Sequence, residues 1–218
     1  MFRMFAEGMV NLLESSQIES EVIVAGSEGA KSRHLAEEYD FTYIEQPNQP
    51  LATKMNATTL ACQDKSPDYV FALGSDDVFS KESFDLYIEK MNEGIDYIGV
   101  LDFYFYDLAT KTALYWGGYR GGRAGNPCGA GRCFSRRLMD VLGWRLWETR
   151  HNGILDTTMD EKLKSIPHTE YMFRLKEHGV LAVDIKSRTN MTPYAMWDNT
   201  FASDPAPITS RFPFLCVE

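Results

Sequence analysis

Short apolar runs alternate with longer amphipathic segments over residues 1–80 of this chain. The runs 21–25 (EVIVA) and 69–73 (YVFAL) are too short for a helix, and a glycine follows each, as is typical of buried strands. The segments 31–39 and 53–63 have the spacing of helices, and 40–46 reads as a further short strand. This alternation predicts an α/β domain with a mostly parallel central sheet flanked by helices.

The rest of the chain is expected to continue the same single domain, 1–218. Its strands are expected at 96–108, at 110–117 as a hairpin arm, and at 179–187; helices are expected at 81–91 and 135–142. A glycine-rich loop fills 117–131, and the tail 193–218, which contains four prolines, is expected to be irregular.

Composition narrows the class of protein. A net charge of −9 disfavours electrostatic binding of nucleic acid over a broad surface, although the segment 119–137 contains five arginines. The four scattered cysteines show no metal-ligand spacing and indicate reduced thiols in a cytoplasmic protein. No apolar run reaches the length of a membrane span.

Two strand exits carry the same Gly-Ser-acid pattern. Ser27 and Glu28 follow the first run, and Ser75, Asp76 and Asp77 follow the run 69–73. Ligands of open α/β sheets bind beyond the carboxyl ends of strands, so the first exit is expected to meet a base and ribose. The second pairs two carboxylates, which suits a hard cation such as Mn²⁺ or Mg²⁺ together with phosphate oxygens. The alternative is a plain turn in which Ser75 or Asp76 caps the following helix.

The stretches PNQPLATKMNATTLACQ (47–63) and DYVFALGSDDVFS (68–80) resemble the nucleotide-sugar half of GT-A-type glycosyltransferases, in the nucleotide-diphospho-sugar transferase superfamily and similar to family 2. The resemblance implies a single Rossmann-like GT-A domain whose nucleotide-binding half spans about 1–80. It places Asn48, Lys54 and Asn56 at the nucleotide sugar. It makes Asp77 the metal ligand and Asp76 a ribose or sugar contact, while Ser75 stands where the family has its first aspartate.

A second stretch, NPCGAGRCFSRRLMDVLGW (126–144), resembles the family's glycine-rich segment where donor sugar and acceptor meet. Gly129, Ala130 and Gly131 would let the backbone approach a sugar closely, in an acceptor and catalytic half of about 96–192. A simple glycine turn before a helix is the alternative.

The resemblance also implies a carboxylate base after the glycine segment. Asp156 is the candidate because it follows an apolar pair, whereas Asp160 and Glu161 have the look of first-turn helix charges. His168 is a candidate late metal ligand, with an ordinary loop or cap histidine as the alternative. Lys186 ends the late strand; an exposed strand end is favoured there over a contact to diphosphate.

Together these features predict a metal-dependent glycosyltransferase that moves a sugar from a nucleoside-diphosphate sugar to a hydroxyl acceptor. The acceptor can be a glycan, a lipid-linked sugar, a small molecule or a modified nucleobase. The family begins with a strand, whereas this chain begins with the helix 2–13; this difference and Ser75 motivate an alternative, a nucleotide-sugar-binding module without turnover. A nucleotidyltransferase is the other alternative, since it also places carboxylates and a lysine around a metal and phosphates.

Overall fold

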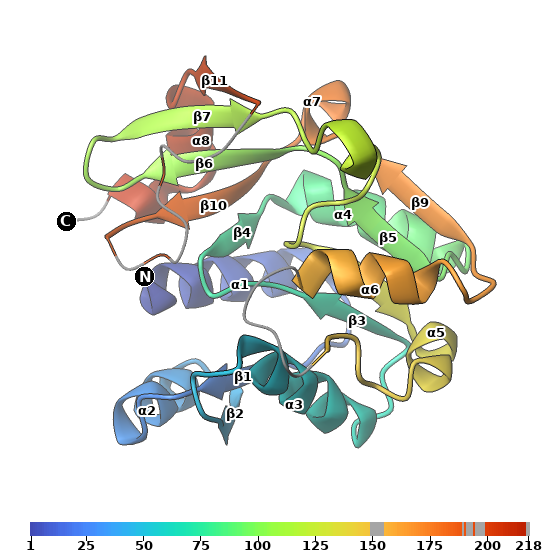
Figure 1. Cartoon of the computed structure of the whole chain (residues 1–218). Coiled ribbons are helices and arrows are strands. Elements are labelled where there is room, and N and C mark those ends of the chain that lie inside the picture. Colours follow the sequence, from blue (N-terminus) through green and yellow to red (C-terminus); the bar gives the residue numbers. More distant parts are fainter. Residues whose placement is uncertain (149–154, 189, 191–193, 195–198, 217–218) are drawn as a thin grey trace.

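The structure is a computed structural model that describes residues 1–148, 155–188, 190, 194 and 199–216. Helices and strands alternate from the N-terminus to residue 72, and later in the chain two consecutive strands form an antiparallel hairpin over residues 103–116 (Figure 1). In chain order the elements are α1 (Phe2–Ser16), β1 (Ile23–Gly26), α2 (Ala30–Glu38), β2 (Thr42–Glu45), α3 (Leu51–Gln63), β3 (Tyr69–Ala72), β4 (Asp77–Phe79), α4 (Lys81–Asn92), β5 (Tyr97–Val100), β6 (Phe103–Asp107), β7 (Thr112–Trp116), η1 (Gly121–Arg123), β8 (Arg132–Ser135), α5 (Arg136–Val141), α6 (Leu155–Leu163), β9 (Glu170–Phe173), α7 (Leu175–His178), β10 (Ala182–Lys186), β11 (Thr200–Ser203), α8 (Ala206–Arg211) and η3 (Pro213–Cys216).

The strands of the described residues form three sheets, with the orders β1-β2, β11-β7-β6-β10-β4 and β3-β8-β5-β9. Pairing is parallel between β1 and β2, β10 and β6, and β5 and β9. It is antiparallel between β10 and β4, β11 and β7, β3 and β8, β5 and β8, and β6 and β7. The fold is therefore mixed α/β, and the expectation of a mostly parallel sheet is wrong.

In the four-stranded sheet the pairing is mixed because β8 lies between β3 and β5 and runs antiparallel to both. In the five-stranded sheet it is mixed because β4, β7 and β11 form antiparallel pairs there. The segment that forms β8, 132–135, follows directly on the glycine-rich loop and was not expected to be a strand. The tail from 193 also departs from expectation, because β11 adds an edge strand to β7 and α8 follows it.

Several local expectations are confirmed. The runs after residue 20 and from Tyr69 form β1 and β3, and the helix from Lys81 forms α4. The cap of α4 is Ser80, whose hydroxyl accepts a hydrogen bond from the backbone N–H of Ser83, so neither Ser75 nor Asp76 caps it.

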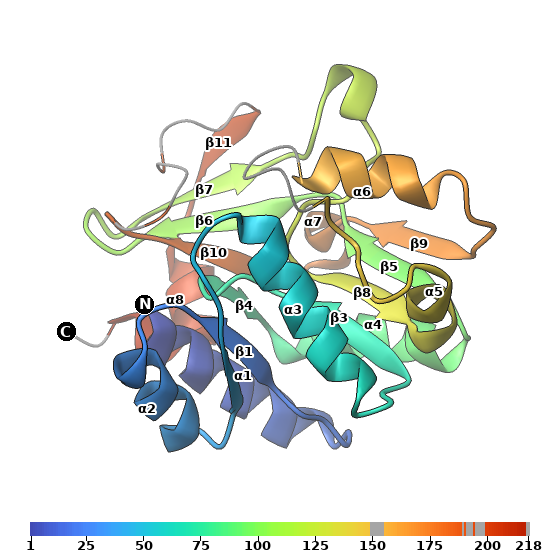
Figure 2. The same cartoon turned by 60° about the horizontal axis from the view of Figure 1, so that its bottom comes forward.

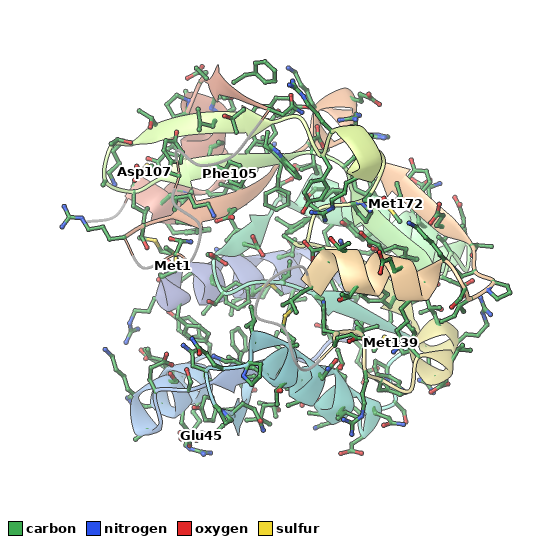
Figure 3. All side chains as sticks on the ribbon, viewed as in Figure 1. Met1, Glu45, Phe105, Asp107, Met139 and Met172 are labelled. Carbon is green, nitrogen blue, oxygen red and sulfur yellow. The ribbon has the colours of Figure 1, made fainter. Side chains whose placement is uncertain are left out.

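The five-stranded sheet and the β1–β2 pair lie at opposite ends of the molecule (Figures 1 and 2). Helices α2 and α3 flank the β1–β2 pair, and α1 runs beneath β4. Figure 3 shows Glu45 at the β2 end and Phe105 on β6 in the opposite sheet.

The main hydrophobic core packs α1 and α4 against the sheets. Phe5 of α1, Phe84 and Tyr87 of α4, and Phe105 of β6 are all at most 7% exposed within this one cluster. The hydroxyl of Tyr87 donates a 2.6 Å hydrogen bond to the carbonyl oxygen of Gly131. The core therefore reaches directly to the end of the glycine-rich loop and fixes where that loop ends.

A second cluster joins α3, α5 and α6. Leu138 of α5 and Met159 of α6 are fully buried in it, beside Ala52 of α3. This packing sets the position of α6, and with it the direction of the polar residues on its other face. All four cysteines are free thiols. None of the helices in the described part of the chain is both long and apolar enough to cross a membrane.

Candidate functional site

Three aspartates converge where β4 and β10 lie side by side. One carboxylate oxygen from each of Asp76, Asp77 and Asp184 lies within 4.8 Å of the others. Asp77 begins β4, and Asp184 is its direct partner on the antiparallel strand β10. Carboxylate oxygens at this separation form the kind of oxygen-rich site that Mg²⁺ or Mn²⁺ prefers.

The turn before β4 is built around the aspartates. The backbone N–H of Gly74 donates a 2.7 Å hydrogen bond to Oδ2 of Asp77. A Cβ added at Gly74 would lie 2.5 Å from Oδ1 of Asp76 and 2.8 Å from Oδ2 of Asp77. Glycine is therefore needed here because any side chain would collide with the two carboxylates.

Two neighbouring side chains orient the acidic group. The ammonium of Lys186 lies 2.6 Å from Oδ2 of Asp184, while Oδ1 of Asp184 is buried and has no hydrogen-bond partner among the residues that the structure describes. The amide of Asn190 donates a 2.6 Å hydrogen bond to Oδ2 of Asp76. Lys186 is only 3% exposed, so the expectation of an exposed strand end is wrong. A buried carboxylate oxygen with no donor near it is well suited to accept a cation.

Burial and mutual repulsion dominate the electrostatics of this group. Burial raises the pKa of Asp77 well above its usual value, and the neighbouring Asp76 and Asp184 raise it further. Burial also raises the pKa of Asp184 to about 7, with Asp76 adding to the rise and Lys186 opposing it. Three carboxylates face one ammonium, so a bound divalent cation would relieve the repulsion that remains.

A pocket of about 160 Å³ opens over the acidic group and is shared by both halves of the chain. Its walls come from the face of β6 and β7 that carries Phe103, Phe105 and Trp116, from the glycine-rich segment, and from the first turn of α6. The lining residues are Asp76, Asp77, Phe103, Phe105, Trp116, Tyr119, Cys128, Gly129, Ala130, Asp156 and Asp184. The strand-exit aspartates, two residues of the glycine segment and Asp156 therefore meet in one place.

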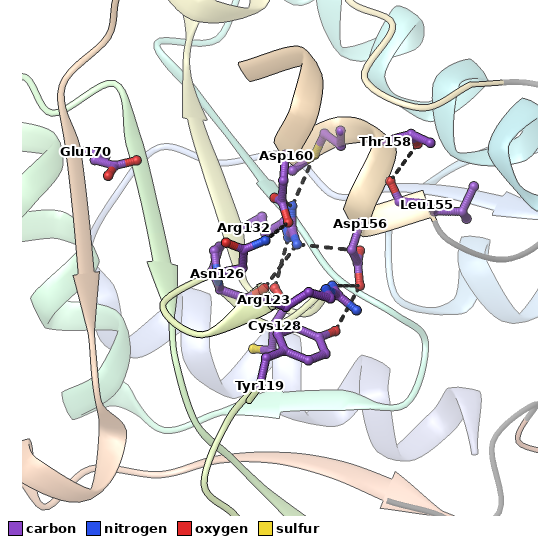
Figure 4. Close-up of polar contacts among 12 residues, drawn as sticks. Tyr119, Arg123, Asn126, Cys128, Arg132, Leu155, Asp156, Thr158, Asp160 and Glu170 are labelled. Carbon is purple, nitrogen blue, oxygen red and sulfur yellow. Dashed lines mark hydrogen bonds and ion pairs between the residues drawn. The ribbon is translucent and has the colours of Figure 1, made fainter. Parts of the chain in front are cut away.

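Asp156 stands at the start of α6 and is about a third exposed. The hydroxyl of Tyr119 donates a 3.3 Å hydrogen bond to its Oδ2, and Nη2 of Arg132 lies 3.7 Å from its Oδ1 (Figure 4). Nη2 of Arg123 lies 4.0 Å from Oδ2. The carboxylate is thus held at the pocket wall with an accessible edge.

Arg132, at the start of β8, ties the glycine-rich loop to α6. Its side chain is 1% exposed and donates to the carbonyl oxygens of Cys128 at 2.9 Å and Pro127 at 3.0 Å. A third hydrogen bond of 2.8 Å joins it to Oδ1 of Asp160, whose other oxygen accepts from Asn126 (Figure 4). Burial outweighs the attraction of Arg132 and raises the pKa of Asp160. Asp160 is therefore a buried structural partner rather than a solvated first-turn charge.

The glycine segment was expected to approach a sugar, and part of it lines the pocket next to Asp156. A Cβ added at Gly129 would lie 3.1 Å from both carboxylate oxygens of Asp156. Gly131 has a φ of +73°, and a Cβ there would lie 2.4 Å from the ring of Phe79. Only Gly129 and Ala130 line the pocket, while Gly131 is buried behind it.

The first strand exit gathers a second group of predicted residues. The ammonium of Lys54, in the first turn of α3, lies 3.3 Å from Oγ of Ser27 and 3.5 Å from Oδ1 of Asn48. The hydroxyl of Ser27 donates to Glu28 at 3.1 Å. Ser27 and Glu28 were expected here from the strand-exit pattern, and Asn48 and Lys54 from the resemblance; the structure brings the four into one polar cluster at the end of β1.

Other predicted residues lie outside these groups. Asn56 is 3% exposed, and its amide exchanges two hydrogen bonds with the backbone of Trp147, at 2.6 and 3.1 Å. It holds that segment in place and does not line the pocket. Ser75 is exposed in the turn before β4 and is absent from the pocket lining.

His168 lies at the loop before β9. Its Nδ1 is 2.7 Å from the carbonyl oxygen of Ile166, and its Nε2 is 3.6 Å from a carboxylate oxygen of Glu170. Among the described residues, the acidic group that can hold a metal contains Asp184 as its third member and does not contain His168.

Sequence reasoning missed Asp184 and Arg132 as site residues. Asp184 lies in an apolar strand with the pattern Ala-Val-Asp-Ile-Lys, and the alternation of that strand places Asp184 and Lys186 on one face. Two charged residues on the same face of an otherwise buried strand were the signal that could have indicated it. Arg132 carried no local signal apart from the cluster of arginines around it.

Comparisons with known proteins give limited information. No protein-family model matches this chain, and neither does any curated protein. Among solved structures, A197 from STIV aligns with a TM-score of 0.42 and 14% identity over 71% of this chain and 82% of that one. HddC from Yersinia pseudotuberculosis aligns with a TM-score of 0.46 and 14% identity over 84% of this chain and 78% of that one. The structure of HddC complexed with GMP-PN aligns with a TM-score of 0.39 and 14% identity over 97% of this chain and 84% of that one. These three TM-scores lie below 0.5, so the similarities carry no weight for the function of this chain.

Proposed function

We propose that this chain is a metal-dependent glycosyltransferase that moves a sugar from a nucleoside-diphosphate sugar to a hydroxyl acceptor. One observation carries the proposal: a single pocket joins the acidic group of Asp76, Asp77 and Asp184 to Gly129 and to the carboxylate of Asp156. Glycosyl transfer needs a cation near the departing diphosphate, room for a sugar, and a carboxylate on the acceptor side. All three needs correspond to residues of this pocket.

The acidic group would hold the metal. Asp77 and Asp184 face each other across the strand pair, and the unpartnered Oδ1 of Asp184 is available as a ligand atom. A bound Mn²⁺ or Mg²⁺ would supply positive charge that stabilises the leaving diphosphate. Lys186 keeps Asp184 in its orientation through the 2.6 Å ion pair.

The cluster at the end of β1 would receive the nucleotide. Lys54 contacts the neutral oxygens of Ser27 and Asn48, and a diphosphate would offer it a charged partner instead. Charge-assisted hydrogen bonds to phosphate are stronger than those to neutral oxygens, so the exchange favours binding. The half-exposed position of Lys54 leaves it accessible.

Asp156 would act on the acceptor. It lies in the pocket wall opposite the backbone of Gly129, and Tyr119 and Arg132 fix its orientation. In an inverting reaction its carboxylate would accept the proton of the acceptor hydroxyl as the new glycosidic bond forms.

A thermal-shift screen of nucleoside-diphosphate sugars, each with Mn²⁺ and with EDTA, tests the proposal. A ligand that binds the folded state at about one hundred times its Kd stabilises it by about 2.7 kcal/mol, which is readily visible as a higher Tm. We expect at least one donor to raise the Tm in Mn²⁺ and to do so much less in EDTA.

Product analysis with that donor separates the alternatives. Release of nucleoside diphosphate supports glycosyl transfer or donor hydrolysis. Formation of pyrophosphate from a nucleoside triphosphate and a sugar phosphate would indicate nucleotidyl transfer instead. Donor binding without either product would indicate a binding module, and the absence of any shift with every donor would refute the proposal.

A further inference from the structure

The loop between β7 and β8 carries an arginine at the edge of the pocket. Arg123 ends the short helix η1, and its guanidinium lies flat over the ring of Tyr119, 3.5 Å from the ring centroid. Tyr119 itself lines the pocket and donates a hydrogen bond to Asp156. Figure 4 shows the three side chains together, with Arg123 and Tyr119 on the same side of Asp156.

The guanidinium of Arg123 is held in place, but two of its three nitrogens, Nε and Nη2, form no hydrogen bond with the described residues. Its Nε and Nη2 are buried and donate to no hydrogen-bond acceptor in the described residues, and the nearest carboxylate oxygen, on Asp156, is 4.0 Å from Nη2. Buried donors without acceptors are rare in folded proteins, and each such group calls for an explanation. A planar donor fork fixed by stacking on an aromatic ring is a common way to bind phosphate or carboxylate.

The side chain of Arg123 as a whole is 35% exposed, so it lies at an accessible edge of the pocket although Nε and Nη2 are covered. A Cβ added at Gly121, Gly122 or Gly125 would meet no atom within 4 Å, so the loop around Arg123 is open. The other arginines of the segment are already engaged: Arg132 with Asp160, Arg136 with Asp68 and Arg137 with Asp96. Arg120, in the same loop as Arg123, is hydrogen-bonded to the side chain of Asn199.

We propose that Arg123 binds an anionic group, a phosphate or a carboxylate, carried by the acceptor whose hydroxyl reaches Asp156. This inference rests on the proposed function for the meaning of "acceptor". Arg123 is assigned to the acceptor and not to the donor because it is next to Asp156, whereas Lys54 and the three aspartates provide the charged contacts for the donor. The acceptor is therefore an acidic or phosphorylated molecule and not a neutral sugar.

Isothermal titration with the folded full-length chain tests the inference. The protein is first saturated with a nucleoside diphosphate and Mn²⁺, and then titrated with glucose, glucose 6-phosphate or glucuronate as probes. We expect the two anionic probes to bind at least about 10-fold more tightly than glucose, since a charge-assisted contact contributes that much. Arg123→Gln should remove this preference, and Arg123→Lys should restore part of it.

Arg120→Gln is the matched control, because it removes the same charge from the same loop but not the unpartnered donors. It should leave the preference within about 2-fold of wild type, whereas a general electrostatic effect would reduce it as much as Arg123→Gln does. Equal binding of glucose and the anionic probes to wild type overturns the inference.

A parallel titration with the nucleoside diphosphate distinguishes the two sources of phosphate. Arg123→Gln should leave nucleoside-diphosphate affinity within about 2-fold; a 10-fold loss there, with no change for the anionic probes, would place Arg123 in the donor site and overturn the inference. If no nucleoside diphosphate binds wild type at all, the proposed function fails. In that case, if the anionic probes still bind and their binding still depends on Arg123, the anion site exists even though the proposed function is wrong.

Discussion

Asp184 stands directly opposite Asp77 in the antiparallel pairing of β10 with β4, which brings a late strand of the chain to the turn that follows β3. Asp76 joins them, so three carboxylates share one site and a single buried ammonium, that of Lys186, accompanies them. A cluster with this excess of negative charge is costly without a cation. The pairing of two strands, and not one local motif, therefore creates the candidate metal site.

Lys186 should act as a substitute for part of that cation. In Lys186→Met the repulsion among the aspartates is no longer offset, so Mn²⁺ should raise the Tm more in the variant than in wild type. Thermal melts with Mn²⁺ and with EDTA measure the difference. Lys81→Met removes an exposed lysine paired with Asp85 and serves as the control. A metal-induced shift that is the same in wild type and Lys186→Met would contradict this role.

Arg132 should be important for stability. Arg132→Met leaves Asp160 buried without its cationic partner, and breaking a buried ion pair in this way typically costs about 3–5 kcal/mol of unfolding free energy. Urea unfolding measures the loss. In the double variant Arg132→Met/Asp160→Asn no buried charge is left, so its stability should exceed that of the single variant. If the double variant is less stable than Arg132→Met, the ion pair is not the cause.

Asp96 should make stability depend on acid pH. The pKa of Asp96 lies well below its usual range, mainly because its carboxylate accepts hydrogen bonds from the guanidinium of Arg137. Hydrogen bonds from Thr169 and Ser135 lower the pKa further. A carboxylate whose pKa is lower in the folded state stabilises the fold above its unfolded pKa, about 3.9, and loses that effect as pH falls toward the folded pKa. The stability difference between wild type and Asp96→Asn should stay constant from pH 7 to about pH 5 and shrink below about pH 4. Urea unfolding at each pH measures this difference. If the stability difference between wild type and Asp96→Asn is the same at pH 3 as at pH 7, Asp96 is not the source of the pH dependence.

Asp156 should act in the chemical step. Asp156→Asn keeps the size of the side chain and can still accept from Tyr119, but it cannot take a proton, so turnover should fall by about 10²–10⁴-fold. Donor affinity should stay within a few fold, because the charged donor contacts lie elsewhere. Glu161→Gln, an exposed change in the same helix, is the control and should keep normal turnover. Near-normal turnover in Asp156→Asn would remove it from the mechanism.

Local sequence patterns indicated several of the residues that the structure brings together in the candidate site. The run from Tyr69 to the glycine, followed by two aspartates, correctly indicated a strand that ends at an acidic turn. Gly129, Ala130 and Asp156, which the sequence singled out, line one pocket, whereas Gly131 does not; their roles toward a sugar and an acceptor stay predictions. These features could be predicted from the sequence because strand ends and glycine turns depend mainly on residues that are neighbours in the chain.

What the sequence did not reveal depends on contacts between distant segments. In the four-stranded sheet the insertion of β8 between β3 and β5 makes the pairing mixed, and in the five-stranded sheet β10 pairs antiparallel with the much earlier strand β4. Asp184 and Lys186 become a buried pair only when β10 lies between β6 and β4. Asn56 matched the motif of a sugar contact but pairs with the backbone of Trp147, far away in the chain.

The most direct test of the account is calorimetric binding of a nucleoside diphosphate to wild type, Asp77→Asn and Asp184→Asn, each in Mn²⁺ and in EDTA. Asp77→Asn should fold at least as stably as wild type in EDTA, because it removes one of the mutually repelling carboxylates. Asp184→Asn also removes the partner of the buried ammonium of Lys186, so it should be less stable than Asp77→Asn. We predict that Mn²⁺ strengthens binding at least about 10-fold in wild type and that each variant loses most of this gain while its affinity in EDTA stays unchanged. Equal affinity with and without Mn²⁺ in all three proteins would contradict the central claim that these aspartates form a metal-assisted nucleotide site.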